Sequence, residues 1–257
     1  MSEAATYFKI DQALVKSLSQ TLIDSGVTPI LWGDYLLTIY GVPSIVGCLD
    51  FIIPKEGLPG AISALKKMEK LCMCSDIRAC SVAREERLPP IPLFHMHLGT
   101  PASKLYVYLW SHSEILGSVP EAKIPVRTAI EKNPTRLYIS ASDKSVLPEP
   151  RPGRGRGALS EGGGQVIVPS SHIMLEAYIR LSAAHLDGGH GPFYLSMITY
   201  VEEYIAGDGL LDEKLLSEPA QTFWQGWQQG ELSMWGLCRR FTSDLEASQL
   251  LTIHQSQ

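Results

Sequence analysis

The chain has 257 residues, 45% of them hydrophobic, and a formal net charge of −5 at pH 7. This length and apolar content are enough for one large domain or two small ones with a buried core. The acidic balance argues against a nucleic-acid-binding protein, because such proteins usually carry a basic surface. The sequence contains no apolar run of the roughly 18 residues that a membrane-spanning helix needs, so no membrane partner is expected.

The amino terminus and the cysteines indicate the compartment. The first residues lack the basic and apolar regions of a secretory signal. The five cysteines are odd in number and lie mostly among apolar residues, which is typical of free thiols in a reducing environment. A cytoplasmic protein is therefore predicted, with the nucleus as the alternative.

The first predicted element is a helix with Asp11 as its N-cap and Gly26 as its stop. Leu14, Leu18 and Leu22 recur at i, i+4 spacing within it. This spacing indicates an amphipathic helix whose leucine face is buried.

The next segment, residues 28–54, predicts a strand, a glycine turn at Gly33, a short helix, and a second strand that carries Asp50 among apolar neighbours. Backbone N–H groups at a glycine-led helix start can receive phosphate oxygens, and a nearby acid can hold a cation against the phosphate. The structural alternative is that Gly33 serves only the turn and that Asp50 caps a neighbouring backbone group.

Helix and strand patterns then alternate. The predicted elements are an amphipathic helix over 58–71, a strand over 76–82, a charged, proline-rich connection over 84–92, and strands over 94–98 and 105–110. The last two are expected to form an antiparallel hairpin. Strands separated by helices and followed by a hairpin predict an α/β fold with a mixed sheet.

The composition changes in the second half. Residues 146–167 are rich in proline, glycine and arginine and predict a linker or loop, because such a stretch cannot form a helix interior or a central strand. Its basic residues, Arg151, Arg154 and Arg156, suit a phosphate, an acidic peptide or RNA, or simply a solvated linker. The predicted organisation is an α/β domain over 1–145, this linker or loop, and a helical subdomain over 168–257.

Two histidines share one face of the predicted strand 94–98. They are His95 and His97, and side chains alternate along a strand. Together with His112 they form a set of imidazoles that suits Zn²⁺ or another transition metal. Hydrogen-bonded histidines that line a cleft are the commoner arrangement, and in that setting the pair would contact a ligand anion.

Three cysteines, Cys72, Cys74 and Cys80, lie close together in the sequence. A Cys-x-Cys pair alone lacks the paired Cys-x-x-Cys spacing and the second ligand cluster of a zinc site. Thiols packed at a helix end and in a strand are therefore predicted.

Residues 31–54 resemble the opening motif of the nucleotidyltransferase fold, in which a glycine pair precedes a helix and an Asp-x-Asp strand binds metal. Asp34 stands where the second glycine usually lies, and Cys48 stands where the first aspartate usually lies. A thiol is a poor Mg²⁺ ligand. The third acid is expected on a later strand, yet neither 94–98 nor 105–110 contains Asp or Glu.

The two strands just named, the segment 111–120 and the basic run that begins at Pro150 resemble a group of uncharacterised fungal nucleotidyltransferase-like proteins. The resemblance covers most of residues 28–250. It implies a nucleotidyltransferase-like mixed sheet followed by a helical carboxy-terminal subdomain, and it implies no established substrate.

The resemblance also assigns roles to particular residues. Gly33 and Asp34 would line the phosphate end of a nucleotide site, and Asp50 would be the remaining catalytic acid and Mg²⁺ ligand. His95 and His97 would form the opposite wall of that site.

Three functions follow from these roles. The first is a nucleotidyltransferase-like protein with a depleted metal site, acting as a weak binder of a nucleotide or another phosphate-bearing small molecule, or as a pseudoenzyme. The second is an active Mg²⁺-dependent nucleotidyltransferase that modifies a small molecule or a protein. The third is a non-catalytic interaction module with a protein partner. No cofactor other than Mg²⁺ is expected.

Overall fold

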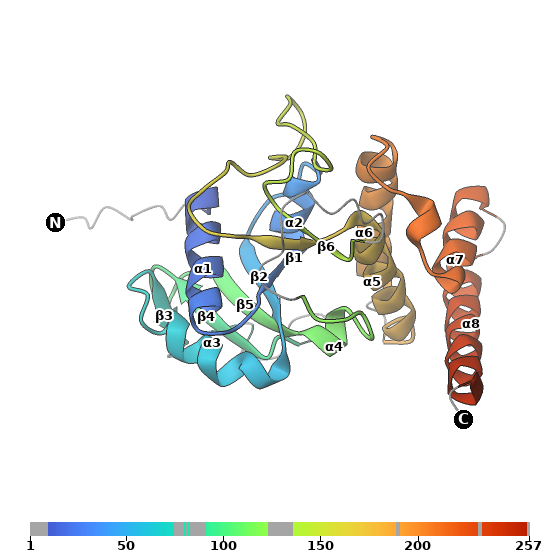
Figure 1. The fold of residues 1–257 in the computed structure, drawn as a ribbon, viewed down its shortest axis with the longest axis horizontal. Helices are drawn as coiled ribbons and strands as arrows, with labels where there is room; N and C mark the ends of the chain where they lie inside the picture. Colours follow the sequence, from blue (N-terminus) through green and yellow to red (C-terminus); the bar gives the residue numbers. More distant parts are fainter. Residues whose placement is uncertain are drawn as a thin grey trace. The chain divides into compact units, whose positions relative to one another are not determined.

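A computed structural model describes residues 10–74, 80, 82, 91–122, 136–188, 191–230 and 233–255. The chain divides into two compact units, one ending at Pro169 and the other beginning at Ser170. The described part of the first unit holds a seven-stranded mixed sheet with helices, and that of the second is helical (Figure 1). The predicted α/β class is thereby confirmed.

The first unit alternates helices and strands along the chain. Its helices are α1 (Gln12–Asp24), α2 (Gly33–Ile39), the 3-10 turn η1 (Lys55–Gly57), α3 (Leu58–Leu65) and α4 (His112–Ile115). Its strands are β1 (Ile30–Trp32), β2 (Cys48–Ile53), β3 (Leu71–Met73), β4 (Phe94–Leu98), β5 (Tyr106–Ser111), β6 (Tyr138–Ser140) and β7 (Ile167–Pro169).

The strand order in the sheet is β3-β4-β5-β2-β1-β7-β6. The pairs β2–β5 and β1–β7 are parallel, and the other neighbouring pairs are antiparallel. In this register Asp50 faces Trp32 on β1 and Tyr108 on β5, and Tyr108 in turn faces His95 on β4. Residues paired across strands project from the same face of a sheet, so these four side chains form one row across it.

The predicted first helix is confirmed in detail. The Asp11 carboxylate caps α1 by accepting a hydrogen bond from the backbone N–H of Leu14 at 3.0 Å. Leu14, Leu18 and Leu22 are all buried. Helix α1 packs against α3, alongside the sheet (Figure 1).

The predicted helix over 58–71 is too long. Helix α3 ends at Leu65, and Leu71 already belongs to β3, where it pairs with Leu98 of β4. Pairing with a neighbouring strand has overridden the helical pattern of the last residues, as tertiary contacts commonly do. The predicted strand over 76–82 and the connection over 84–92 lie largely outside the described residues.

The antiparallel hairpin of β4 and β5 is confirmed. By contrast, β6 and β7 were not predicted, because a strand of three residues is too short to show alternation.

The proline- and glycine-rich segment 146–167 lies in the first unit, and part of it packs against the end of α2. The backbone N–H of Gly155 donates to the carbonyl of Gly41 at 2.8 Å, and that of Gly157 donates to the carbonyl of Thr38 at 2.9 Å. A Cβ on Gly155 would approach the Thr38 carbonyl oxygen to 2.6 Å, so only glycine fits there. This stretch is thus held against the domain by backbone hydrogen bonds.

The second unit consists of helices, in agreement with the pattern after residue 168. Pro219 lies in the first turn of α7, and Gly230, with φ +63°, ends that helix as a left-handed cap. Phe223 and Trp224 are buried in its core. The elements are α5 (Ser171–Ala184), α6 (Gly191–Tyr200), the π-helix η2 (Val201–Ala206), the 3-10 turn η3 (Glu213–Leu215), α7 (Glu218–Gln229) and α8 (Met234–Gln255).

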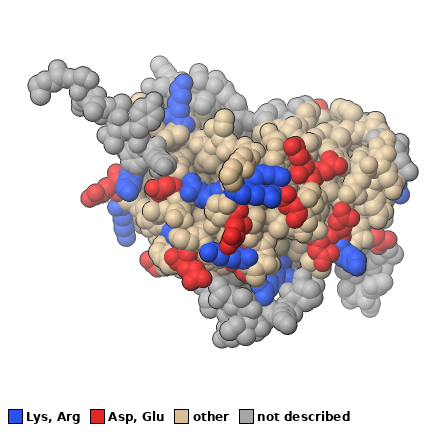
Figure 2. All heavy atoms as spheres, turned by 90° about the horizontal axis from the view of Figure 1, so that it is seen from above, with Lys and Arg blue, Asp and Glu red and all other residues tan. Residues whose placement is uncertain are grey.

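On the face drawn in Figure 2, basic side chains adjoin acidic ones and form no broad positive surface. This intermixing accords with the net charge of −5. None of the helices within the described ranges combines the length and hydropathy needed to cross a bilayer.

Candidate functional site

Gly33 and Asp50 meet where β1 turns into α2. Gly33 has φ +67°, a backbone conformation that favours glycine. A Cβ at this position would also overlap the Oδ2 atom of Asp50. Glycine is therefore required twice, by the turn and by the close approach of the carboxylate. The structure brings together the two residues that the sequence placed at the phosphate and metal ends of one site.

The carboxylate of Asp50 is enclosed by hydrogen-bond donors. Asp50 is only 3% exposed. Its Oδ1 accepts from the indole N–H of Trp110 at 2.9 Å, and its Oδ2 accepts from the thiol of Cys48 at 3.1 Å. Both oxygens of this buried acid thus have protein partners, which is how buried polar groups are normally stabilised.

These partners have the wrong chemistry for a cation site. A magnesium ion needs several oxygen ligands, whereas Trp110 can only donate and Cys48 uses its proton in the hydrogen bond. Asp34 lies in the first turn of α2 and is partly exposed. Asp34 directly follows Gly33 and is, with Asp50, one of the two acids in residues 28–54.

A third acid was expected on a later strand of the sheet, and β5 is the parallel neighbour of β2. Its residues on the face of Asp50 are aromatic: Tyr106, Tyr108 and Trp110. Tyr106 and Tyr108 stack with ring centroids 5.4 Å apart, and Trp110 is 5.8 Å from Tyr108. On β5 the sheet face that carries Asp50 thus presents aromatic rings and no carboxylate.

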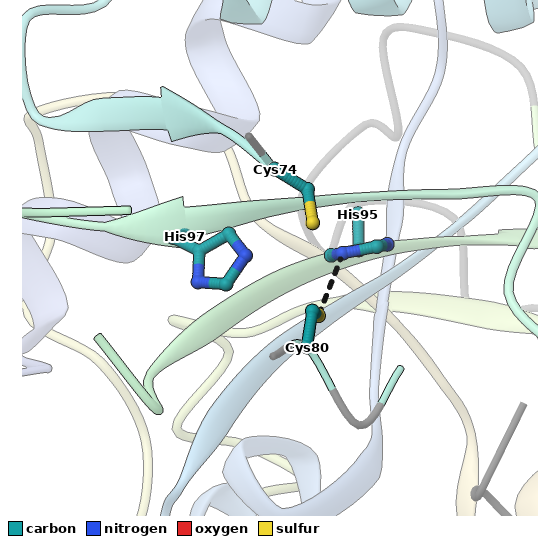
Figure 3. A group of neighbouring side chains, drawn as sticks. All are labelled: Cys74, Cys80, His95 and His97. Carbon is teal, nitrogen blue, oxygen red and sulfur yellow. Dashed lines mark hydrogen bonds between the residues drawn. The ribbon is translucent and has the colours of Figure 1, made fainter. Parts of the chain in front are cut away.

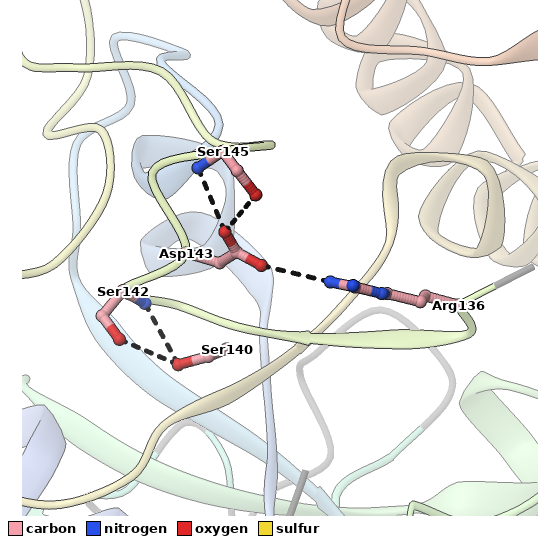
Figure 4. A network of polar contacts seen from close by, with 5 residues as sticks. All are labelled: Arg136, Ser140, Ser142, Asp143 and Ser145. Carbon is pink, nitrogen blue, oxygen red and sulfur yellow. Dashed lines mark hydrogen bonds and ion pairs between the residues drawn. The ribbon is translucent and has the colours of Figure 1, made fainter. Parts of the chain in front are cut away.

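The other buried carboxylate among the described residues, Asp143, is committed elsewhere (Figure 4). It follows β6 and accepts hydrogen bonds from the Ser145 backbone N–H at 3.0 Å and the Ser145 hydroxyl at 2.5 Å. Arg136 approaches its other oxygen at 3.3 Å. The adjacent hydroxyls of Ser140 and Ser142 are 2.9 Å apart. This network holds the turn after β6, and it gives Asp143 a structural role.

The histidines predicted to form the opposite wall of the site lie on β4. Tyr108 stands between Asp50 and His95 in the cross-strand row. Strands are about 4.8 Å apart, so the backbones of Asp50 and His95 are separated by roughly 10 Å. His112 lies apart from this pair, in the first turn of α4, where its Nε2 is 3.0 Å from the hydroxyl of Tyr138. The structure therefore does not gather the three histidines around one point.

Two cysteines complete a different group with His95 and His97 (Figure 3). Cys74 follows β3 and Cys80 comes from the segment beyond it, and one potential ligand atom from each of the four residues lies within 4.8 Å of the others. Among the described residues this is the group of three or more His, Cys, Asp or Glu side chains that could hold a metal ion.

From the sequence, these cysteines were predicted to be packed thiols, with no connection to the histidines. The signal that joins them is the antiparallel pairing of β3 with β4, in which Cys72 faces His97, so that the next position on the same face, Cys74, falls beside His95. A three-residue strand gives too little pattern for this register to be read from the sequence.

The basic run of segment 146–167 also contacts α2. The guanidinium of Arg156 lies over the ring of Tyr35, 5.3 Å from its centroid. Burial raises the pKa of Tyr35 to about 12, while the positive charge of Arg156 acts in the opposite direction. Arg156 is thus a packed residue beside the helix that begins at Gly33.

Comparison with known proteins adds no family to this description. No protein-family model, no curated protein and no solved structure matches the chain.

Proposed function

We propose that this chain is a nucleotidyltransferase-like protein whose nucleotidyl-transfer site is closed, and that it acts as a pseudoenzyme, by binding and without turnover. The observation that carries the proposal is the enclosure of Asp50 by the Trp110 indole and the Cys48 thiol. The arrangement of a strand, a glycine turn, a short helix and an acid-bearing strand supports the likeness to that fold. The surroundings of the acid argue against its use in metal-dependent transfer.

The groups that surround Asp50 do not suit metal-dependent transfer. Transfer of a nucleoside monophosphate needs divalent metal to neutralise the triphosphate and the entering oxygen. A metal at Asp50 would have to displace two hydrogen bonds from a buried carboxylate and would gain one protein oxygen ligand in return. Hydrogen bonds to charged groups contribute about 1.5–3 kcal/mol each, so the closed arrangement is the favoured one.

Nucleotide titration by calorimetry tests this proposal. ATP, GTP, CTP and UTP are added in turn, with and without Mg²⁺, to the wild type, Asp50→Asn and Asp24→Asn. We expect no Mg²⁺-dependent heat in the wild type, and any Mg²⁺-independent heat should persist in Asp50→Asn. Asp24→Asn is the matched control, since it removes the same charge from the exposed end of α1, outside the candidate site.

The active-enzyme alternative predicts a different pattern. Mg²⁺-dependent nucleotide binding in the wild type that disappears in Asp50→Asn and survives in Asp24→Asn would overturn the proposal. A search for the acceptor, a small molecule or a protein, would then be justified.

A second candidate function, a protein-interaction module, is favoured by aromatic side chains of the second unit. Phe193 is 45% exposed and Tyr200 is 37% exposed. They lie two turns apart on α6 and therefore share one face of that helix. Trp235 of α8 is also exposed, at 49%. Exposed aromatic residues are enriched at protein interfaces.

Partner capture from a cell extract separates this function from nucleotide binding. The double variant Phe193→Ser/Tyr200→Ser is expected to lose a captured partner that Asp50→Asn retains. Loss of the same partner in Asp50→Asn alone would place binding in the first unit and contradict the interaction surface on α6.

A further inference from the structure

The strongest unassigned feature of the molecule is the group formed by Cys74, Cys80, His95 and His97 (Figure 3). We propose that these four side chains bind one Zn²⁺ ion in a tetrahedral, structural site. The proposal goes beyond the function inferred from Asp50 and does not depend on it. It rests on the ligand types, on the state of His97 and on the distances between the ligand atoms.

One ring nitrogen of His97 makes a hydrogen bond, and the other has no hydrogen-bond partner among the described residues. Its Nδ1 is 2.8 Å from the carbonyl oxygen of Ser103, and because a carbonyl only accepts, Nδ1 carries the proton. In the neutral ring Nε2 then has a lone pair. His97 is 3% exposed, and within the described part of the chain no group hydrogen-bonds to its buried Nε2.

This arrangement matches that of a metal-bound imidazole. Histidine ligands usually donate their second ring N–H to a carbonyl or a carboxylate, which fixes the tautomer and the ring orientation. An orphaned buried nitrogen costs free energy unless something uses its lone pair. A zinc ion in contact with Nε2 removes that cost.

The separations fit a tetrahedral ion. Bond lengths of about 2.3 Å for Zn–S and about 2.0–2.1 Å for Zn–N place a sulfur and a nitrogen ligand about 3.5 Å apart. The Cys80 sulfur and His95 Nε2 are 3.4 Å apart, and all four ligand atoms lie within 4.8 Å of one another. Small side-chain rotations would bring the remaining ligand atoms to the separations that a tetrahedral ion requires.

The ligand set selects the metal and its role. Two thiolates and two imidazoles in a tetrahedral arrangement favour Zn²⁺ over Mg²⁺ or Ca²⁺, which prefer oxygen. Four protein ligands leave no position for water or substrate, which is typical of a structural site. Cys80 and His97 are buried, whereas Cys74 and His95 are partly exposed, so the site is shielded on one side and open to an entering ion on the other.

Such an ion would add a cross-link between elements that strand pairing already joins. Cys74 follows β3, His95 and His97 belong to β4, and Cys80 lies between these strands in the sequence. β3 has three residues and ends the sheet. A short edge strand gains the most from a metal that ties its end to the next strand.

Metal titration of the full chain tests the proposal. The protein is stripped of metal with a chelator under reducing conditions, then titrated with Co²⁺ and afterwards with Zn²⁺. One equivalent of Co²⁺ should give the visible absorption of a tetrahedral site and a near-ultraviolet thiolate-to-cobalt band, and Zn²⁺ should remove both. Absence of the thiolate-to-cobalt band would overturn the proposal.

Variants assign the ligands. Cys80→Ser and His97→Gln should each weaken Zn²⁺ binding by about a hundredfold or more, because changes to outer-shell partners alone cost about 10- to 100-fold. Cys72→Ser is the matched control, since its thiol lies on β3 and hydrogen-bonds to the Gly99 carbonyl at 3.3 Å. An equal loss in Cys72→Ser and Cys80→Ser would contradict the assignment.

Alkylation of the wild-type protein tests the same ligands without relying on variants, which can fail to fold. Zinc should protect Cys74 and Cys80 from alkylation, and chelation should expose both, as read by peptide mass spectrometry. Recovery of these two cysteines as a disulfide-linked peptide, before any oxidant is added, would assign the pair to thiol–disulfide chemistry and overturn the zinc site.

Discussion

Asp50 and His97 project from the same face of one sheet, yet they stand in opposite conditions. Both oxygens of the Asp50 carboxylate receive hydrogen bonds from protein side chains, whereas Nε2 of His97 has no hydrogen-bond partner in the described part of the chain. Residue type alone would favour the acid as the metal ligand. The hydrogen-bond partners that a buried group already has therefore decide whether it can bind a ligand.

Removal of metal tests this contrast between Asp50 and His97 most directly, through its effect on the melting temperature. Zinc present at about a hundred times its dissociation constant would stabilise the first unit by about 2.7 kcal/mol. For a unit of this size that corresponds to a melting temperature about 5–10 °C higher. Calorimetric melting with and without a chelator measures the shift, and Asp50→Asn should leave the shift unchanged. A chelator effect that vanishes in Asp50→Asn would reverse the comparison.

Gly33→Ala tests how tightly the Asp50 region is closed. We expect a loss of about 2–4 kcal/mol in the free energy of unfolding, because alanine resists the left-handed conformation and its Cβ would overlap Asp50. Gly26→Ala is the matched control: Gly26 has φ +81° and nothing within 4 Å of an added Cβ. Urea unfolding of both variants gives the difference in the free energy of unfolding. Equal losses in the two variants would mean that the Asp50 carboxylate moves aside at little cost.

Trp110→Phe removes one donor from Asp50 and keeps most of the ring. The expected loss is about 1.5–3 kcal/mol, the usual contribution of a hydrogen bond to a charged group. In an Asp50→Leu background the same substitution should cost much less, since there is no acceptor left. A coupling energy below about 0.5 kcal/mol in this double-mutant cycle would show that the indole is only a packing residue.

The smallest expected effect is a pH dependence of stability that arises from His172, a buried histidine of α5. Unlike His97, it is not among the proposed zinc ligands. Burial lowers its pKa from the usual 6.5, and the nearby Asp212 opposes the shift. A base whose folded-state pKa is lowered binds its proton more readily when unfolded. Stability should therefore fall as the pH drops below about 6.5.

His172→Gln should flatten this part of the pH profile. The raised pKa of Glu176, caused by burial, acts in the opposite sense and is common to both proteins. Thermal melting of the two proteins from pH 7 to pH 5, in the presence of a chelator, provides the measurement. The difference should persist without metal, and its disappearance on chelation would link His172 to the zinc-dependent unit.

The sequence predicted the parts of the fold that repeat a strong local pattern. The leucine spacing of α1, the Gly33 turn and the alternation in β4 and β5 all appear where expected. The strands β6 and β7 were missed because three residues carry no periodicity. The end of α3 was missed because pairing of β3 with β4 is a tertiary effect.

The candidate sites divide in the same way. The proximity of Gly33 and Asp50 follows from residues that are neighbours in one strand–helix–strand segment. The donors around Asp50 include Trp110, which reaches it only through the parallel pairing of β2 and β5. The meeting of Cys74 with His95 likewise depends on the register between two strands, and a single sequence does not specify that register.

The parallel pairing of β1 with β7 has a consequence for the newly made chain. Ile30 of β1 pairs with Ile167 of β7, whereas the β4–β5 hairpin closes over a short loop. During synthesis β1, which is entirely buried in the finished sheet, remains an open apolar edge until residues 167–169 have been made. Such edges are templates for aggregation. Fragments that stop before β7 should therefore aggregate, even though most of the sheet has already been translated.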